Sequence, residues 1–167
     1  MQCHVALSQE THPEMAAHAV SKSVHEALGE TECHLAFVFF SPHFSSEIQR
    51  MVEIIHENLR PQALVGCMGE GVIGGDKEIE EHPGLVLWGI RNSDMQVVPF
   101  MLTPKTEGEV TSLEGWPPGL ESTAHSHTFF LFADPFSTPI DELFSLLDHH
   151  TPGSTAIGGI ASGGMDV

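Results

Sequence analysis

The sequence predicts an α/β fold in which a mixed parallel and antiparallel sheet is flanked by helices. Three strand patterns alternate with two amphipathic helical patterns in residues 1–67, and this alternation is typical of parallel strands joined by helices. Two later strand patterns, at 85–90 and 95–102, are joined by a short polar turn, which favours an antiparallel addition. The glycine-rich stretch 157–167 has no closing element, so we expect residues 1–167 to be the incomplete, C-terminally truncated half of a larger two-part domain.

The first helical pattern follows a strand pattern at 4–8. We expect this helix to begin at Thr11 as the cap with Pro13 in its first turn, and to end at Gly29. Apolar residues recur along it at intervals of three and four, which marks a buried face: Met15, Ala16, Ala19, Val20, Val24, Ala27 and Leu28.

The next elements are a buried strand, a second helix and a third strand. Residues 35–40 show no polar alternation, which is typical of a central strand covered on both faces. The second helix is expected to have Ser45 as its cap and to stop before Pro61, and the third strand spans 63–65. The apolar face of this helix comprises Ile48, Met51, Val52, Ile55 and Leu59.

The second half of the chain has a different rhythm. The polar residues 91–94 predict a hairpin turn between the strands at 85–90 and 95–102. Residues 103–124 predict one long loop, and loops of this length are usually functional. Further strands are expected at 128–133 and 156–160, with a short helix at 139–147. No internal repeat is recognisable in the sequence.

Charge and composition exclude several classes of partner. The net charge is −17, from 23 acidic residues against six lysines and arginines that are scattered along the chain. Nucleic acid and anionic membrane surfaces are therefore not expected to bind. The three cysteines indicate reduced thiols, and neither a signal peptide nor an apolar run long enough to span a bilayer is recognisable. We expect a soluble, cytoplasmic protein.

The stretch 63–75 is the strongest indication of a ligand site. A short apolar strand runs into five glycines with one cysteine and one carboxylate among them, and strand ends of this kind are common binding positions in α/β proteins. A dinucleotide site is not expected, because Pro83 leaves no room for the long helix that this fingerprint needs. The expected ligand-binding residues are Ser41, Gly66, Cys67, Gly69, Glu70 and Gly71.

Other reactive residues have more than one interpretation. Cys67 lies in acidic surroundings that disfavour a thiolate, so we expect a pocket-lining residue rather than a nucleophile. Histidines at 125, 127, 149 and 150 have some metal-ligand character, but solvated side chains are the expected role, and neither a metal nor another cofactor is predicted. Glu70, with Glu78, Glu80 and Glu81 nearby, could hold a ligand amine. Trp116 fits either a pocket lid or a loop anchor.

These segments resemble the FIST (F-box and intracellular signal transduction) family. The resemblance is carried by Leu35–Phe40 with Ser41-Pro42, by Ala63–Gly75, by Glu78–Glu81 with Pro83–Leu87, and by Ile157–Gly163. It implies the N-terminal FIST region, an intracellular sensory module for small ligands such as amino acids. It also implies a C-terminal FIST region or a signalling output domain as partner, and it supplies no catalytic residues.

We therefore expect a noncatalytic sensory domain that binds a small ligand as input to signal transduction. Two alternatives belong to other classes of protein. One is an interaction scaffold that binds a protein partner and no small ligand. The other is a hydrolase or thiol enzyme centred on Cys67.

Overall fold

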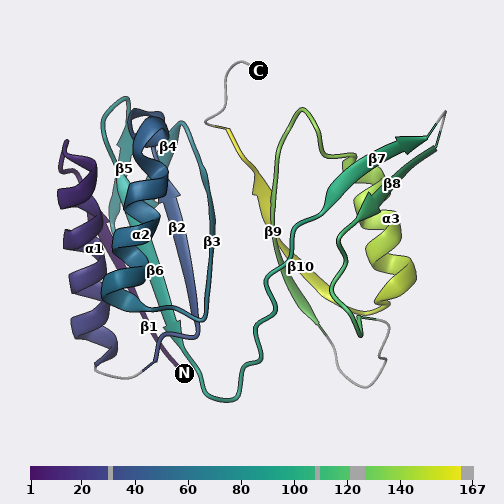
Figure 1. Ribbon diagram of the computed structural model, residues 1–167, viewed down its shortest axis with the longest axis horizontal. Coiled ribbons are helices and arrows are strands. Elements are labelled where there is room, and N and C mark those ends of the chain that lie inside the picture. The colour runs from purple at the N-terminus through teal and green to yellow at the C-terminus, as the bar shows by residue number, and fades with distance from the viewer. Residues whose placement is uncertain (30–31, 108–109, 121–126, 163–167) are drawn as a thin grey trace. The chain divides into compact units, whose positions relative to one another are not determined.

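The computed structural model describes residues 1–29, 32–107, 110–120 and 127–162. The chain forms two compact units (Figure 1). The first comprises Met1–Val97 with Ser162–Val167, and the second comprises Val98–Ala161.

The first unit is built on a four-stranded sheet in the order β1-β6-β2-β3. Its strands are β1 (Gln2–Ser8), β6 (Leu85–Arg91), β2 (Leu35–Phe40) and β3 (Ala63–Met68). β2 and β3 are parallel, whereas β6 runs antiparallel to both β1 and β2. The expected mixed sheet in an α/β fold is confirmed.

The antiparallel partner of β6 differs from the expectation. Residues 95–102 form no strand, although a turn does follow β6, with the Met95 N–H donating to the Asn92 carbonyl at 3.1 Å. Both edges of β6 are already filled, by β1 on one side and β2 on the other. The backbone of 95–102 therefore has no edge of β6 left to pair with.

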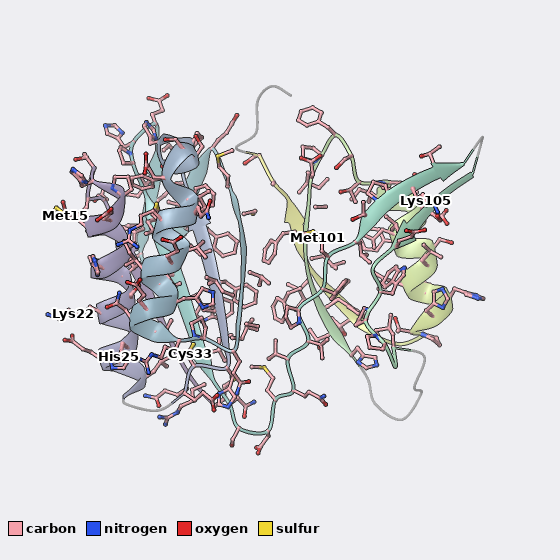
Figure 2. All side chains as sticks on the ribbon, in the orientation of Figure 1. Met15, Lys22, His25, Cys33, Met101 and Lys105 are labelled. Carbon is pink, nitrogen blue, oxygen red and sulfur yellow. The ribbon has the colours of Figure 1, made fainter. Side chains whose placement is uncertain are left out.

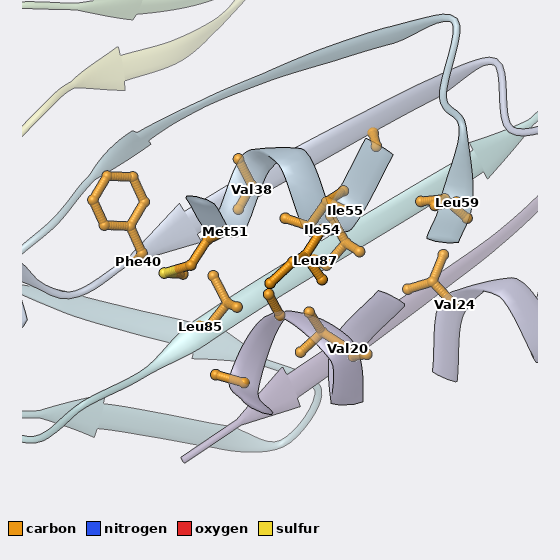
Figure 3. Close-up of a cluster of buried hydrophobic side chains, with 14 of the residues drawn as sticks. Val20, Val24, Val38, Phe40, Met51, Ile54, Ile55, Leu59, Leu85 and Leu87 are labelled. Carbon is orange, nitrogen blue, oxygen red and sulfur yellow. The ribbon is translucent and has the colours of Figure 1, made fainter. Parts of the chain in front are cut away.

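Helices α1 (Pro13–Leu28) and α2 (Ile48–Leu59) cover one face of this sheet (Figure 1). A 3-10 helix, η1 (Pro42–Glu47), leads from β2 into α2. Alternate residues of the two inner strands point into the same apolar cluster as the helices (Figure 3). The cluster includes Val20, Val24, Val38, Phe40, Met51, Ile54, Ile55, Leu59, Leu85 and Leu87.

Both expected helix caps are wrong. α1 is capped by His12 rather than Thr11, and α2 by Glu47, because Ser45 is taken up in η1. The buried face of α1 is also rotated from the expected one. Ala17 and Ser21 are buried, and the Ser21 hydroxyl is satisfied by the Ala17 carbonyl at 2.6 Å, while Met15 is 57% exposed and points outward (Figure 2).

A short hairpin packs on the opposite face of the sheet. It consists of β4 (Gly71–Gly74) and β5 (Lys77–Glu80), which pair antiparallel. Val72 and Ile79 from the hairpin join Val86 of β6 in a second apolar cluster. β2 is buried along nearly its whole length, which confirms the expected central strand.

The second unit contains a hairpin and a parallel strand pair. The hairpin is β7 (Thr103–Glu107) with β8 (Val110–Glu114), and the parallel pair is β9 (Thr128–Ala133) with β10 (Thr155–Ile160), joined through α3 (Ile140–His150). The expected long loop 103–124 is therefore wrong for 103–107 and 110–114, and its residues 108–109 and 121–124 lie outside the described part of the chain. Leu113 is the one apolar side chain of that hairpin described as buried, so the stretch carries little hydrophobic periodicity.

A repeat is visible in the structure. Each unit contains two parallel strands that are joined through a helix and paired over six residues: β2–α2–β3 in the first and β9–α3–β10 in the second. A proline stands two residues after the first strand of each, at Pro42 and Pro135. In each unit the fourth residue of the second strand is a glycine, Gly66 or Gly158, where a Cβ would lie 1.8 Å from the opposite carbonyl oxygen. The two units share few identical residues, so their likeness is one of strand register, and no repeat is recognisable in the sequence.

Candidate ligand site at the carboxyl ends of β2 and β3

The structure brings the expected site residues to one end of the first unit. Ser41 follows β2 directly, and the Gly69 N–H donates to the Phe40 carbonyl at 3.0 Å, one step beyond the last pair of the parallel ladder. Gly66 and Cys67 lie within β3 and Gly71 begins β4. The expected glycine loop is therefore two strands joined by a tight turn, which consists of Gly69 and Glu70.

Ser41 is fully buried and its polar atoms are engaged inside the protein. Its N–H donates to the Gly84 carbonyl at 2.9 Å, and its Oγ accepts the Gly84 N–H at 3.0 Å. The His43 Nδ1 lies 3.3 Å from the same Oγ. These bonds fix the segment that enters β6 against the end of β2, which gives Ser41 a structural role.

Glu70 is the exposed charged group of the turn. Its backbone N–H donates to the Ser162 Oγ at 3.2 Å. Ser162 was not among the expected site residues. It lies in the C-terminal glycine-rich segment, 92 residues away from Glu70, and no spacing pattern in the sequence links the two.

The glycines differ in what they contribute. Gly66 and Gly71 are exposed, but a Cβ at Gly66 would meet the Val38 carbonyl oxygen and one at Gly71 would lie 3.2 Å from the Ile79 carbonyl oxygen. A Cβ at Gly69 would lie 2.9 Å from the Gly71 carbonyl oxygen. Close backbone contacts therefore account for glycine at positions 66 and 69, while a side chain at 71 would crowd the Ile79 carbonyl oxygen without excluding a small shift.

Cys67 is half-buried, and burial raises the pKa of its thiol. The thiol is therefore largely protonated near neutral pH, whereas a nucleophilic cysteine needs a stabilised thiolate. Within the described ranges, no side-chain base forms a hydrogen bond with Cys67. This geometry gives no support to chemistry at the thiol.

Metal ligands are not gathered in the part of the chain that the structure describes. No group of three or more histidine, cysteine or acidic side chains there could hold an ion. His125 lies outside the described residues, while the rings of His149 and His150 meet edge to face with centroids 5.1 Å apart.

No described helix is both long and apolar enough to cross a bilayer.

The comparisons with known proteins agree with the resemblance found in the sequence. The family model of the FIST N domain matches residues 34–167. Uncharacterized protein Rv0628c of Mycobacterium tuberculosis is 28% identical over 149 residues, which cover 89% of this chain and 37% of that protein. Uncharacterized protein Mb0898c of Mycobacterium bovis is 27% identical with the same coverage.

The chain thus spans just over a third of the length of the curated relatives that it matches. No solved structure matches it significantly. Because the family match extends over most of the sequence and includes β2, β3 and the turn between β3 and β4, the chain belongs to the FIST N domain family.

Proposed function

We propose that this chain is a noncatalytic, cytoplasmic sensory domain that binds a small ligand such as an amino acid at the Gly69–Glu70 turn, as input to signal transduction. The observation that carries the proposal is the exposed Glu70 carboxylate at the carboxyl ends of two parallel strands. The turn beneath it is fixed by the Gly69–Phe40 and Glu70–Ser162 hydrogen bonds. Strand ends of this kind are the usual binding position in open α/β sheets.

The contacts of the turn indicate which end of an amino acid would bind where. The Glu70 carboxylate can accept charge-assisted hydrogen bonds from a ligand amine. The backbone N–H groups of Gly69 and Glu70 are already donated within the protein, so they are not free to hold a ligand carboxylate. The Ser162 hydroxyl accepts from Glu70 and keeps its own hydrogen, which makes it the donor that we assign to that carboxylate.

The remaining expected residues take supporting roles in this proposal. Ser41 holds Gly84, Gly66 and Gly71 allow close approach of neighbouring backbone, and Cys67 lines the end of β3. A bound ligand would bias the turn between ordered and open states. A C-terminal FIST region or a signalling output domain would respond to that change. The curated relatives are longer than this chain, which leaves room for such regions in those proteins.

A thermal-shift screen of the chain against the common amino acids tests the proposal. A ligand present at about 100 times its Kd stabilises the folded state by roughly 2.7 kcal/mol, which raises Tm by several degrees. Glu70→Gln should remove the shift. Glu10→Gln is the matched control, because Glu10 is an exposed acid of the first unit outside the acidic group at 70–81. A shift that survives Glu70→Gln unchanged would contradict this placement of the site.

The scaffold alternative is favoured by one specific observation. All six residues of β10 are exposed, including Ile157 at 51% and Ile160 at 58%, whereas parallel strands are normally covered on both faces. A scaffold would cover this strand with a protein partner such as the C-terminal FIST region. Co-purification with that region should be lost in Ile157→Glu and kept in Phe136→Glu, which alters an exposed apolar residue outside β10.

A further inference from the structure

A surface hollow of about 370 Å³ lies in the second unit, and the proposed sensory function does not use it. This volume is at the lower end of the roughly 300–1,000 Å³ range typical of small-molecule sites. The hollow is lined by Trp116, Pro117, Pro118, Gly119, Leu120 and His150. The described lining is mostly apolar and has no carboxylate, ammonium or guanidinium group among these six residues.

Trp116 packs against the core of the second unit and is partly exposed. Its ring stacks on Phe100 with centroids 6.3 Å apart and planes 24° apart, and Phe100 meets Phe129 edge to face. Both phenylalanines belong to the apolar core of this unit or pack against it. The tryptophan therefore packs as a loop anchor, one of the two roles expected from the sequence, and it also lines the hollow.

The second wall comes from the end of α3. His150 is the last residue of this helix, and its ring centroid lies 6.3 Å from that of Trp116. Thr151 closes the helix, since its N–H and its hydroxyl both donate to the Leu147 carbonyl at 2.8 Å. The C-terminus of a helix carries a partial negative charge of about half an elementary unit.

The indole ring of Trp116 is the feature of the hollow that favours a cation. The face of an indole ring carries the negative part of its quadrupole, and the helix end adds to it. Residues 98–161 contain eight acidic residues and one lysine, Lys105, and that lysine is paired with Glu114 at 3.1 Å. No lysine or arginine is among the lining residues that the structure describes, and the proline and leucine walls suit methyl and methylene groups rather than a hydrated metal ion.

We propose that the hollow beside Trp116 binds a small organic cation with an apolar body, of the alkylammonium class. Its positive centre lies over the indole face, and its methyl groups contact Pro117, Pro118 and Leu120. This site is independent of the Gly69–Glu70 turn, so either proposal can fail without the other.

The probes are choline and its neutral carbon isostere, 3,3-dimethylbutan-1-ol. Binding is followed by titrating the probe against Trp116 fluorescence in a Trp88→Phe chain, because the sequence has only two tryptophans. Choline should produce a saturable change, and the isostere should bind about 2- to 30-fold more weakly, which is the ratio that a cation–π contact supplies. No saturable change, or equal affinity for the two probes, overturns the proposal.

A second pair of variants tests the site without changing the tryptophan. His150→Lys places a positive charge in the wall of the hollow and should weaken choline binding at least tenfold. His149→Lys adds the same charge at the neighbouring residue, which does not line the hollow, and should weaken binding much less. Saturation-transfer NMR on the choline methyl signal measures both variants, with circular dichroism as the check on folding. Equal effects of the two lysines would refute the assigned position.

Discussion

Replacing Gly158 by alanine should destabilise the second unit severely, while the same change at Gly159 should not. A Cβ at Gly158 would lie 1.8 Å from the Leu131 carbonyl oxygen and 2.8 Å from its carbonyl carbon, whereas one at Gly159 meets nothing within 4 Å. The obstacle is backbone, so no side-chain rotation relieves it. β9 and β10 would have to separate by roughly 1 Å or more, enough to break hydrogen bonds of about 2.9 Å.

The magnitude follows from the bonds lost and the conformation imposed. Two ladder hydrogen bonds beside Gly158 contribute about 0.5–1.5 kcal/mol each. Its φ of +150° lies in a region that only glycine adopts readily, which adds about 1–3 kcal/mol. We therefore expect Gly158→Ala to lower the free energy of unfolding by about 3 kcal/mol. Gly159→Ala should change it by less than about 1 kcal/mol and in the stabilising direction.

Urea denaturation of the Trp88→Phe chain measures this difference, because Trp116 then reports on the second unit alone. The two alanine variants are compared within that background. Since two compact units can unfold separately, a reporter within one unit is needed. A difference of less than about 1 kcal/mol between Gly158→Ala and Gly159→Ala would refute the close-approach argument, and with it the same explanation for Gly66.

Three further predictions concern buried or locally bonded groups. Ser41→Ala leaves the Gly84 N–H without its partner and should cost about 1–3 kcal/mol of unfolding free energy in urea denaturation, while the exposed Ser45→Ala should cost less than about 0.5 kcal/mol; equal costs would contradict the assigned role. Exposed Cys3 should react with iodoacetamide at pH 7.5 before Cys67 and Cys33, whose pKa values are raised by burial; peptide mass spectrometry over time gives the order, and fastest labelling of Cys67 would revive the thiol-enzyme hypothesis. The Ser137 hydroxyl and N–H lower the pKa of Asp134 below its ordinary 3.8, so this carboxylate favours folding above pH 3.8 and loses that effect as the pH falls through its folded value. Carboxyl carbon shifts in NMR should show the midpoint rising in Ser137→Ala, and an unchanged midpoint would exclude the hydroxyl as the cause.

The sequence predicts the first unit well because its elements carry strong local signals. α1, β2, α2 and β6 each combine an apolar pattern with a proline or glycine boundary. The strand order could not be read in the same way. β6 lies between β1 and β2, and this insertion depends on pairing between residues far apart in the chain, on which local periodicity has no bearing.

The second unit is predicted less completely because its signals are weaker. β9, α3 and β10 are found near their expected positions, but β7 and β8 have few buried apolar residues to mark them. The likeness between β2–α2–β3 and β9–α3–β10 cannot be seen in the sequence, because the two units share strand register but few identical residues. The glycines at 66 and 158 stand in otherwise dissimilar strands. At the candidate site the sequence indicates Glu70, but it cannot indicate Ser162, which approaches only through the fold.

The close backbone contacts of the glycines change how the ligand site should be tested. A glycine run after a strand suggests backbone that approaches a ligand, yet at Gly66 the nearest neighbour is the Val38 backbone and at Gly71 it is the Ile79 carbonyl oxygen. Gly71→Val would therefore disturb the β4–β5 hairpin whether or not a ligand binds, and lost binding in that variant would prove little. Glu70→Gln keeps the shape of the side chain, removes its charge and replaces one acceptor oxygen with an NH2 donor. A ligand that binds through its amine must lose affinity in Glu70→Gln even though the fold is unchanged, and that combination separates ligand contact from structural support.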